Sequence, residues 1–188
     1  MDNKLKQKLK SLALLNAIIE PEWEYRYYSY NSIWGENEEM ASLRDGCGGE
    51  WFIWFSDGLI GFKCTSPVDG LASDFSNLTN QLPTSYTPFV NEPAFSMNTG
   101  SAIWYLESDI WKKYGINIVD LPTPESLIKM SAKEFCVFAE EMYEVDLDEK
   151  IVSKILEGEF ELEMALALNS DIDISELKKE LLEIGLST

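Results

Sequence analysis

The hydrophobic positions of this chain change their spacing twice. Residues 3–19 place leucine and isoleucine at steps of three and four, which predicts an amphipathic helix ended by Pro21. Residues 22–66 instead carry short β-prone runs separated by turn residues, and residues 102–108 predict one more strand. The helical period returns after residue 121. We therefore expect an α+β fold with an N-terminal helix, an antiparallel meander and a C-terminal helical lobe packed on the sheet.

The predicted meander has about four strands between residues 22 and 66. Its clearest signal is residues 51–64, where two apolar runs flank a Ser-Asp-Gly turn, because glycine can adopt the left-handed conformation of a short hairpin loop. Residues 39–45 predict the strand before it, and the glycines of residues 46–49 predict a tight turn between the two. Residues 22–34 contain six aromatic rings, distributed over both faces of a predicted strand. We expect this strand to be covered on both sides over part of its length.

The remaining segments predict an excursion and a series of helices. Residues 67–101 are rich in proline, serine, threonine, asparagine and glycine, and predict a long, partly ordered excursion over the sheet. A helical turn is expected at residues 110–114. We expect residues 1–120 and residues 121–188 to form one compact domain together. The helix signals after residue 121 are a start at Thr123-Pro124-Glu125, a capping box at Ser131–Glu134, stops at Gly158 and Gly185, and an apolar run at residues 162–168.

The charge of the chain limits the classes of partner that it can bind. The formal net charge is −18, and the chain from Asp120 onward holds 18 acidic residues against 6 lysines. A surface of this sign repels nucleic acid and anionic membranes, so we expect neither as a partner. No apolar run approaches the roughly 18–20 residues of a membrane span. Two interpretations remain: a solvated surface that maintains solubility, or a surface that binds a basic protein.

The absence of histidine restricts the possible chemistry further. It excludes Ser-His-Asp and Cys-His catalysis and the usual zinc sites, so an enzyme is disfavoured and we expect no cofactor and no metal. The three cysteines form no CxxC and no signal peptide is recognisable, which predicts reduced thiols in a cytoplasmic protein. Residues 169–180 have the acidic spacing of a calcium loop. Ile174 occupies the position that requires glycine, so a helix cap at Asp173 or Ser175 is the better interpretation.

The chain has two arginines, Arg26 and Arg44, and both lie on predicted strands among aromatic residues. A guanidinium group can stack on a ring and also bind a carboxylate. One interpretation is a structural ion pair with Glu24, Asp45 or Glu50. The other is an exposed patch that binds a partner, because Trp, Tyr and Arg dominate interface hot spots. The candidate binding patch consists of Trp23, Arg26, Tyr28, Trp34 and Arg44.

Three segments carry a resemblance: WEYRYYSYNSIW (residues 23–34), EMASLRDGCGGEWFIWF (39–55) and EPAF (92–95). They resemble a group of uncharacterised small acidic bacterial proteins that share the motifs W-E-x-R-Y-Y-S-(F/Y)-N-S-x-W and M-A-S-(L/M)-R-(D/N)-G-x-G-D. The resemblance covers the first two-thirds of the chain and implies common descent without an activity. Gly49 stands where the pattern has Asp, so a site that used this Asp is not expected here. Genes of this general type are similar to accessory or immunity proteins of bacterial toxin systems.

These patterns give a ranked set of functions. The first is a non-catalytic cytoplasmic interaction protein, immunity-like or regulator-like, that uses its acidic surface and the candidate patch. One alternative is a small-molecule or carbohydrate binder with an aromatic pocket. The other is a hydrolase with a carboxylate dyad drawn from Glu22, Glu24, Asp45 and Glu50. The oligomeric state is not predicted by any of these patterns.

Overall fold

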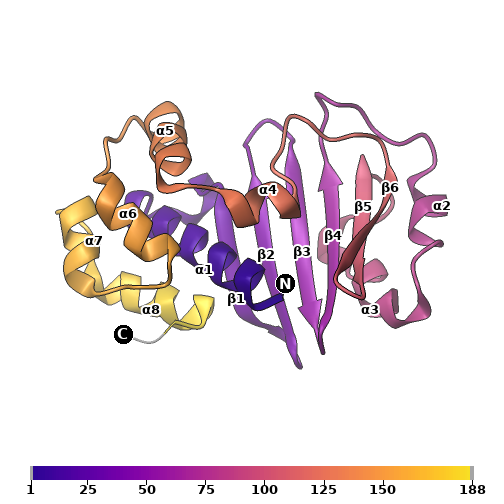
Figure 1. The fold of residues 1–188 in the computed structure, drawn as a ribbon, viewed down its shortest axis with the longest axis horizontal. Helices are drawn as coiled ribbons and strands as arrows, with labels where there is room; N and C mark the ends of the chain where they lie inside the picture. The colour runs from indigo at the N-terminus through magenta and orange to yellow at the C-terminus, as the bar shows by residue number, and fades with distance from the viewer. Residues whose placement is uncertain (1, 187–188) are drawn as a thin grey trace. The chain divides into compact units, whose positions relative to one another are not determined.

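The computed structural model describes residues 2–186 and has an α+β fold (Figure 1). It divides into two compact units. Residues Ile33–Pro124 form a sheet unit, and residues Asp2–Ser32 together with the chain from Glu125 onward form a helical unit. The N-terminal helix therefore shares a unit with the C-terminal helices rather than with the sheet that follows it in sequence.

The elements follow one another in simple order. The strands are β1 (Tyr28–Gly35), β2 (Glu38–Arg44), β3 (Glu50–Ser56), β4 (Leu59–Thr65), β5 (Ala102–Glu107) and β6 (Ile110–Gly115). Between β4 and β5 lie α2 (Phe75–Thr79), η2 (Thr84–Tyr86), α3 (Thr87–Val90) and η3 (Pro93–Phe95). The other helices are α1 (Asp2–Ile19), η1 (Trp23–Tyr25), α4 (Pro124–Lys129), α5 (Ala132–Tyr143), α6 (Glu149–Leu156), α7 (Leu162–Leu168) and α8 (Ile174–Ile184).

The six strands form one antiparallel meander in the order β1-β2-β3-β4-β5-β6. The hairpin of β3 and β4 confirms the clearest sequence prediction, because Ser56 pairs with Leu59 across a two-residue loop. Both loop residues, Asp57 and Gly58, have positive φ, at 46° and 81°. This is the turn conformation that matches the right-handed twist of paired strands.

One face of the sheet unit is filled with aromatic rings. The excursion between β4 and β5 covers this face, with α2 against β5 and β6 (Figure 1). Gly61 of β4 permits the closest approach, since a Cβ there would lie 2.5 Å from the Phe89 ring. The excursion predicted at residues 67–101 is thus correct in outline, but it contains short helices that complete the core. The buried cluster comprises Met40, Phe52, Trp54, Phe75, Leu82, Tyr86, Phe89, Phe95, Ile103 and Tyr105.

The structure corrects the predicted start of the first strand. Trp23–Tyr25 form a single 3₁₀ turn, and β1 begins only at Tyr28. The alternation of aromatic residues continues through this turn, so the sequence pattern did not reveal the boundary. In the turn, Arg26 N–H donates to the carbonyl of Trp23 (3.2 Å), a bond that a strand does not make.

The structure also corrects the helical turn predicted at residues 110–114. Ile110–Gly115 form β6, which pairs with β5. The apolar residues of this segment lie three and four positions apart, a spacing typical of a helix. The two residues before it, Ser108 and Asp109, both have positive φ, at 50° and 62°, and close a tight hairpin.

In the helical unit, α1 buries its leucine stripe and is tied to the C-terminal helices by polar side chains. Ser11 Oγ donates to the carbonyl of Ile155 in α6 at 2.6 Å. Asn169 Nδ2, at the end of α7, donates to the carbonyl of Ile18 at 2.7 Å. The last carbonyl groups of a helix lack partners within it, so each of these bonds satisfies one of them.

Asn16 of α1 is fully buried and organises the segment that follows the helix. Its Oδ1 accepts hydrogen bonds from the Tyr143 hydroxyl at 2.8 Å and from the backbone N–H groups of Tyr27 and Tyr28 at 3.2 and 3.3 Å. Its Nδ2 donates to the carbonyl of Leu12 at 3.2 Å. The side chain therefore supplies the partners that buried backbone groups require.

The C-terminal helices begin and end at the residues that the sequence indicates. α5 has the complete capping box of Ser131 and Glu134. The side chain of Asp173 accepts hydrogen bonds from two backbone N–H groups at the start of α8, which confirms the helix-cap interpretation. Gly158 and Gly185 adopt positive φ, at 90° and 76°, after α6 and α8.

Candidate functional site

The five residues of the candidate patch fall into two groups. Trp23, Arg26 and Tyr28 belong to the helical unit, and Trp34 and Arg44 belong to the sheet unit. The role of the patch in binding stays a prediction.

Arg26 is engaged by three partners inside the helical unit. Its Nη1 lies 2.6 Å from Glu180 Oε2 of α8, and the Arg26 side chain is only 5% exposed. Its Nε donates to the carbonyl of Glu20 at 2.8 Å, and its Nη2 to the carbonyl of Pro21 at 2.6 Å. Arg26 therefore links the segment that follows α1 to helix α8, and we call this set of contacts the Arg26 clamp.

The Arg26 clamp changes one expectation drawn from the sequence. The ion-pair interpretation is correct in kind, but the partner is Glu180 and not Glu24, Asp45 or Glu50. Those three carboxylates were chosen for their closeness to the predicted sheet strands. Arg26 instead follows a 3₁₀ turn in the helical unit, where α8 supplies the carboxylate.

Trp23 and Tyr28 lie around the same clamp but differ in exposure. Tyr28 is buried, and burial raises the pKa of its hydroxyl. Trp23 is 51% exposed. The space that these two side chains line with Arg26 has a volume of about 10 Å³, far below the roughly 300 Å³ at which small-molecule sites begin. Among the three patch residues described in this unit, Trp23 alone presents a large surface.

The sheet-unit group is linked through a row of stacked rings. Trp34 stacks on Phe95 at a centroid distance of 6.0 Å, and Phe95 stacks on Phe52 at 5.0 Å. The exposed Arg44 places its Cζ 5.8 Å from the centre of the Phe52 ring, a cation–π geometry. Trp34 and Arg44 thus stand at the two ends of one aromatic row.

Lys63 is a feature of the sheet unit that the sequence analysis missed. It is fully buried on β4, with Nζ 3.2 Å from Glu50 Oε1 and 5.7 Å from the centre of the Phe52 ring. Burial lowers the pKa of Lys63, and the Glu50 carboxylate opposes this shift. The available signal was a single lysine inside the apolar run of residues 59–64.

The carboxylates considered for a hydrolytic dyad include two with structural partners. Asp45 Oδ1 accepts hydrogen bonds from the N–H groups of Cys47 and Gly49, at 2.7 and 2.8 Å, and closes the glycine turn. Glu50 is paired with Lys63. A different carboxyl group, that of Glu183, has its pKa raised by burial and then by the nearby charge of Glu180. It lines the 10 Å³ space beside Arg26, which has no room for a substrate.

The most pronounced surface feature of the helical unit runs from the end of α5 to the start of α6. Residues 140–149 contain six acidic side chains and no basic one, and all six are exposed. We call this surface the acidic face. Its acidic members are Glu140, Glu141, Glu144, Asp146, Asp148 and Glu149.

The negative charge of the acidic face is felt by a neighbouring thiol. Burial raises the pKa of Cys136 on α5, and the charges of Glu149, Asp146 and Asp148 raise it further. On α5, Val137 lies three and four positions before Glu140 and Glu141, and both Val137 (45%) and Met142 (44%) are exposed. The acidic face therefore combines negative charge with apolar contact area.

Among residues 2–186, no group of three or more cysteine, aspartate or glutamate side chains is placed to hold a metal ion. No helix described here is long and apolar enough to cross a membrane.

No protein-family model, curated protein or solved structure matches the chain.

Proposed function

We propose that this protein is a non-catalytic interaction protein whose helical unit binds a basic protein partner through the acidic face. The observation that carries the proposal is the run of six exposed carboxylates between Glu140 and Glu149, uninterrupted by a basic residue. A surface of one sign accelerates encounter with a partner of the opposite sign and disfavours partners of like sign.

Affinity needs more than charge, because exposed ion pairs contribute little individually. Val137 and Met142 supply apolar area next to the carboxylates, and methionine adapts its shape to different partners. A basic amphipathic surface, with lysines or arginines around an apolar centre, would match both features. An immunity-like role follows the same logic, since an acidic protein can occupy the basic substrate groove of a nuclease.

The test uses two matched triple variants. Glu140→Gln/Glu141→Gln/Asp146→Asn neutralises the acidic face, and Glu36→Gln/Glu107→Gln/Asp120→Asn removes the same charge from exposed residues of the sheet unit. Candidate partners are the proteins encoded beside this one. Each candidate is titrated over the surface-immobilised protein at several salt concentrations, and the dissociation constant is measured.

We expect the acidic-face variant to bind about tenfold more weakly, equivalent to about 1.4 kcal/mol. The sheet-unit variant should bind within about twofold of the unmodified protein. Binding should also weaken as salt rises, because added ions screen exposed charges. Equal losses in the two variants, or binding that salt leaves unchanged, would contradict the proposal.

A further inference from the structure

The helical unit contains a cavity of about 290 Å³ between the segment that follows α1 and one face of α8. This volume is close to the roughly 300 Å³ at which small-molecule sites begin. Ala17 of α1 and Leu177 of α8 are buried and form an apolar floor. Pro21 and Ile172 add apolar walls. The cavity can therefore hold the aliphatic part of a small ligand.

The charged groups that line the cavity are mostly acidic. They are one guanidinium and four carboxylates, those of Arg26, Glu22, Asp173, Glu176 and Glu180. Arg26 Nη1 pairs with Glu180 Oε2 at 2.6 Å, so these two charges offset each other and three carboxylates remain. A concave site with low-dielectric walls concentrates the field of its charges, so this cavity favours a cation over an anion.

The carboxylates of α8 have partners among the described residues, but each uses only one of its two oxygens. Glu180 does so in the pair above, through Oε2. Asp173 Oδ1 accepts from the N–H groups of Ser175 and Glu176, at 2.7 and 3.3 Å, and from the Ser175 hydroxyl at 2.7 Å. Glu176 Oε1 accepts from Lys179 Nζ at 2.7 Å. Because both oxygens of a carboxylate are acceptors, each of the three retains an oxygen that can accept from a ligand.

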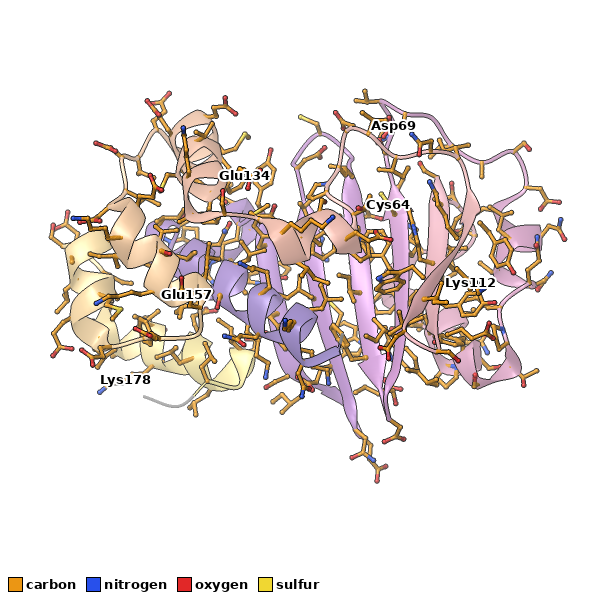
Figure 2. The ribbon with its side chains drawn as sticks, viewed as in Figure 1. Cys64, Asp69, Lys112, Glu134, Glu157 and Lys178 are labelled. Atoms are coloured by element: carbon orange, nitrogen blue, oxygen red, sulfur yellow. The ribbon has the colours of Figure 1, made fainter. Side chains whose placement is uncertain are left out.

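The positive groups of α8 do not cancel the preference for a cation. The side chains of Lys179 and Glu176 are 71% and 62% exposed, so solvent screens their pair and it contributes little. Lys178, labelled in Figure 2, is exposed and does not line the cavity. The dipole at the start of α8 adds only roughly half a positive charge. Glu22 supplies a further exposed carboxylate from the segment that follows α1, so the lining stays negative.

The acidic side chains of α8 stand at both ends of the apolar floor. Asp173, Glu176 and Glu180 lie at steps of three and four residues, so they share one face of the helix with Leu177. At a rise of about 1.5 Å per residue, the distance along the helix from Asp173 to Glu180 is roughly 10 Å. A ligand with a positive charge at each end and an aliphatic middle matches this order of groups.

We propose that the cavity binds a small linear diamine. One ammonium group would bind Asp173 and Glu176, the other would bind Glu180, and the methylene chain would lie on Leu177. The probe is 1,6-diaminohexane, whose extended chain spans nearly the distance between the outer carboxylates. The lysine side chain of a protein partner offers the same ammonium chemistry at one end only, so a probe with a single ammonium group distinguishes the two sources. This inference does not depend on the proposed partner.

The first test titrates 1,6-diaminohexane into the full chain by isothermal titration calorimetry, with the melting temperature as a second readout. We expect one saturable site and a rise in melting temperature. Glu22→Gln/Glu176→Gln neutralises two exposed carboxylates of the cavity and leaves the Arg26 clamp intact, so it should weaken binding about tenfold. The control Glu24→Gln/Glu163→Gln makes the same charge change at exposed residues of the helical unit outside the cavity. It should bind within about twofold of the unmodified protein.

The second test varies the ligand. Hexylamine has the same chain with one ammonium group and should bind about tenfold more weakly, because it loses the charge-assisted hydrogen bonds at one end. Hexanoate has the opposite charge and should not bind. Circular dichroism verifies that every variant is folded. The proposal is overturned by any of three results: no saturable binding of 1,6-diaminohexane up to about 1 mM; equal weakening in the two glutamate variants, which indicates general attraction to an acidic chain; or hexylamine binding as tight as the diamine, which indicates a site for a single ammonium group such as a lysine side chain.

Discussion

The sheet unit and the helical unit are held together by different means. In the sheet unit, β2 to β6 pair with their neighbours in sequence and one face is filled by stacked aromatic rings. In the helical unit, side-chain hydrogen bonds join segments more than a hundred residues apart, such as Ser11 with Ile155 and Arg26 with Glu180. The strands of the first unit pair with neighbours in sequence, whereas the second unit, which also buries the leucine stripe of α1, is joined by polar groups with distant partners.

The largest expected effect comes from breaking the polar centre of the helical unit. Asn16→Leu keeps the size of the side chain but removes the acceptor of the Tyr28 N–H and of the Tyr143 hydroxyl, while the Tyr27 N–H keeps only the Tyr143 oxygen at 2.9 Å. A buried donor left unsatisfied costs about 1–3 kcal/mol, so we expect the free energy of unfolding to fall by about 3–5 kcal/mol in urea titrations. Amide exchange should accelerate most in the helical unit.

Tyr143→Phe is the control for this first prediction. It removes the hydroxyl that donates to Asn16 Oδ1 and accepts from the Tyr27 N–H at 2.9 Å, but it leaves Asn16 Oδ1 as an acceptor for the N–H groups of Tyr27 and Tyr28, so it should cost only about 1 kcal/mol. If Asn16→Leu destabilises the protein no more than Tyr143→Phe does, Asn16 is not the organising residue and the contrast between the units weakens.

The two arginines offer the next comparison, because one lies in each unit. Arg26→Met removes a buried partner of Glu180 and frees two backbone carbonyls, so we expect a loss of about 3 kcal/mol. Arg44→Met removes an exposed cation–π contact with Phe52 and should cost under about 1 kcal/mol. Chemical denaturation measures both. Equal losses would show that the sheet unit also depends on its arginine.

The smallest expected effect is the pH dependence that Lys63 of the sheet unit gives to the stability of the protein. The folded-state pKa of Lys63 lies below its ordinary value of 10.5, so between these two pKa values the unfolded chain binds more protons than the folded one. Stability contributed by this group therefore rises with pH through that window. Lys63→Met should change stability by about 1 kcal/mol or less near neutral pH, since a buried ion pair and an apolar side chain are often equivalent.

The measurement for Lys63 is the difference in unfolding free energy between the unmodified protein and Lys63→Met. Burial raises the pKa of Cys64 to about 12 and of Tyr143 to about 12, and both groups lower stability at alkaline pH in either protein. Because the Lys63 charge itself lowers the pKa of Cys64, both proteins are also measured with Cys64→Ala; the difference should then isolate Lys63 and shift in favour of the protein that retains it as pH rises toward 10.5. A difference independent of pH would refute the assignment.

The same contrast explains how much of the fold was accessible from the sequence. The β3–β4 hairpin was predictable because two apolar runs and a left-handed turn residue lie within fourteen consecutive positions. The caps at Ser131 and Asp173 were predictable for the same reason, since a cap is made by residues two or three positions apart. The prediction at Ile110–Gly115 was wrong because its short apolar run fits the spacing of a helix as well as that of a strand. Only the turn before it, at residues 108–109, distinguishes the two.

The features of the candidate sites also differ in whether the sequence could predict them. The charge of the acidic face is a property of ten consecutive residues and was visible as an acidic C-terminal region. The partner of Arg26 was not, because Glu180 lies 154 positions away on another helix. A cleft of about 310 Å³ between α1 and the end of α6 was hidden as well, since its lining comes from residues 3–14 and residues 155–186, which the folded chain alone brings together.

The helical unit is discontinuous, and this has a consequence for biosynthesis. The leucine stripe of α1 leaves the ribosome before the sheet unit, and its partners in α6, α7 and α8 follow only after the whole sheet unit has been made. At about 5–20 residues per second, the intervening stretch takes roughly 5–20 s to translate. During that interval the nascent chain carries the leucine stripe of α1 without the helices that contact it in the folded protein.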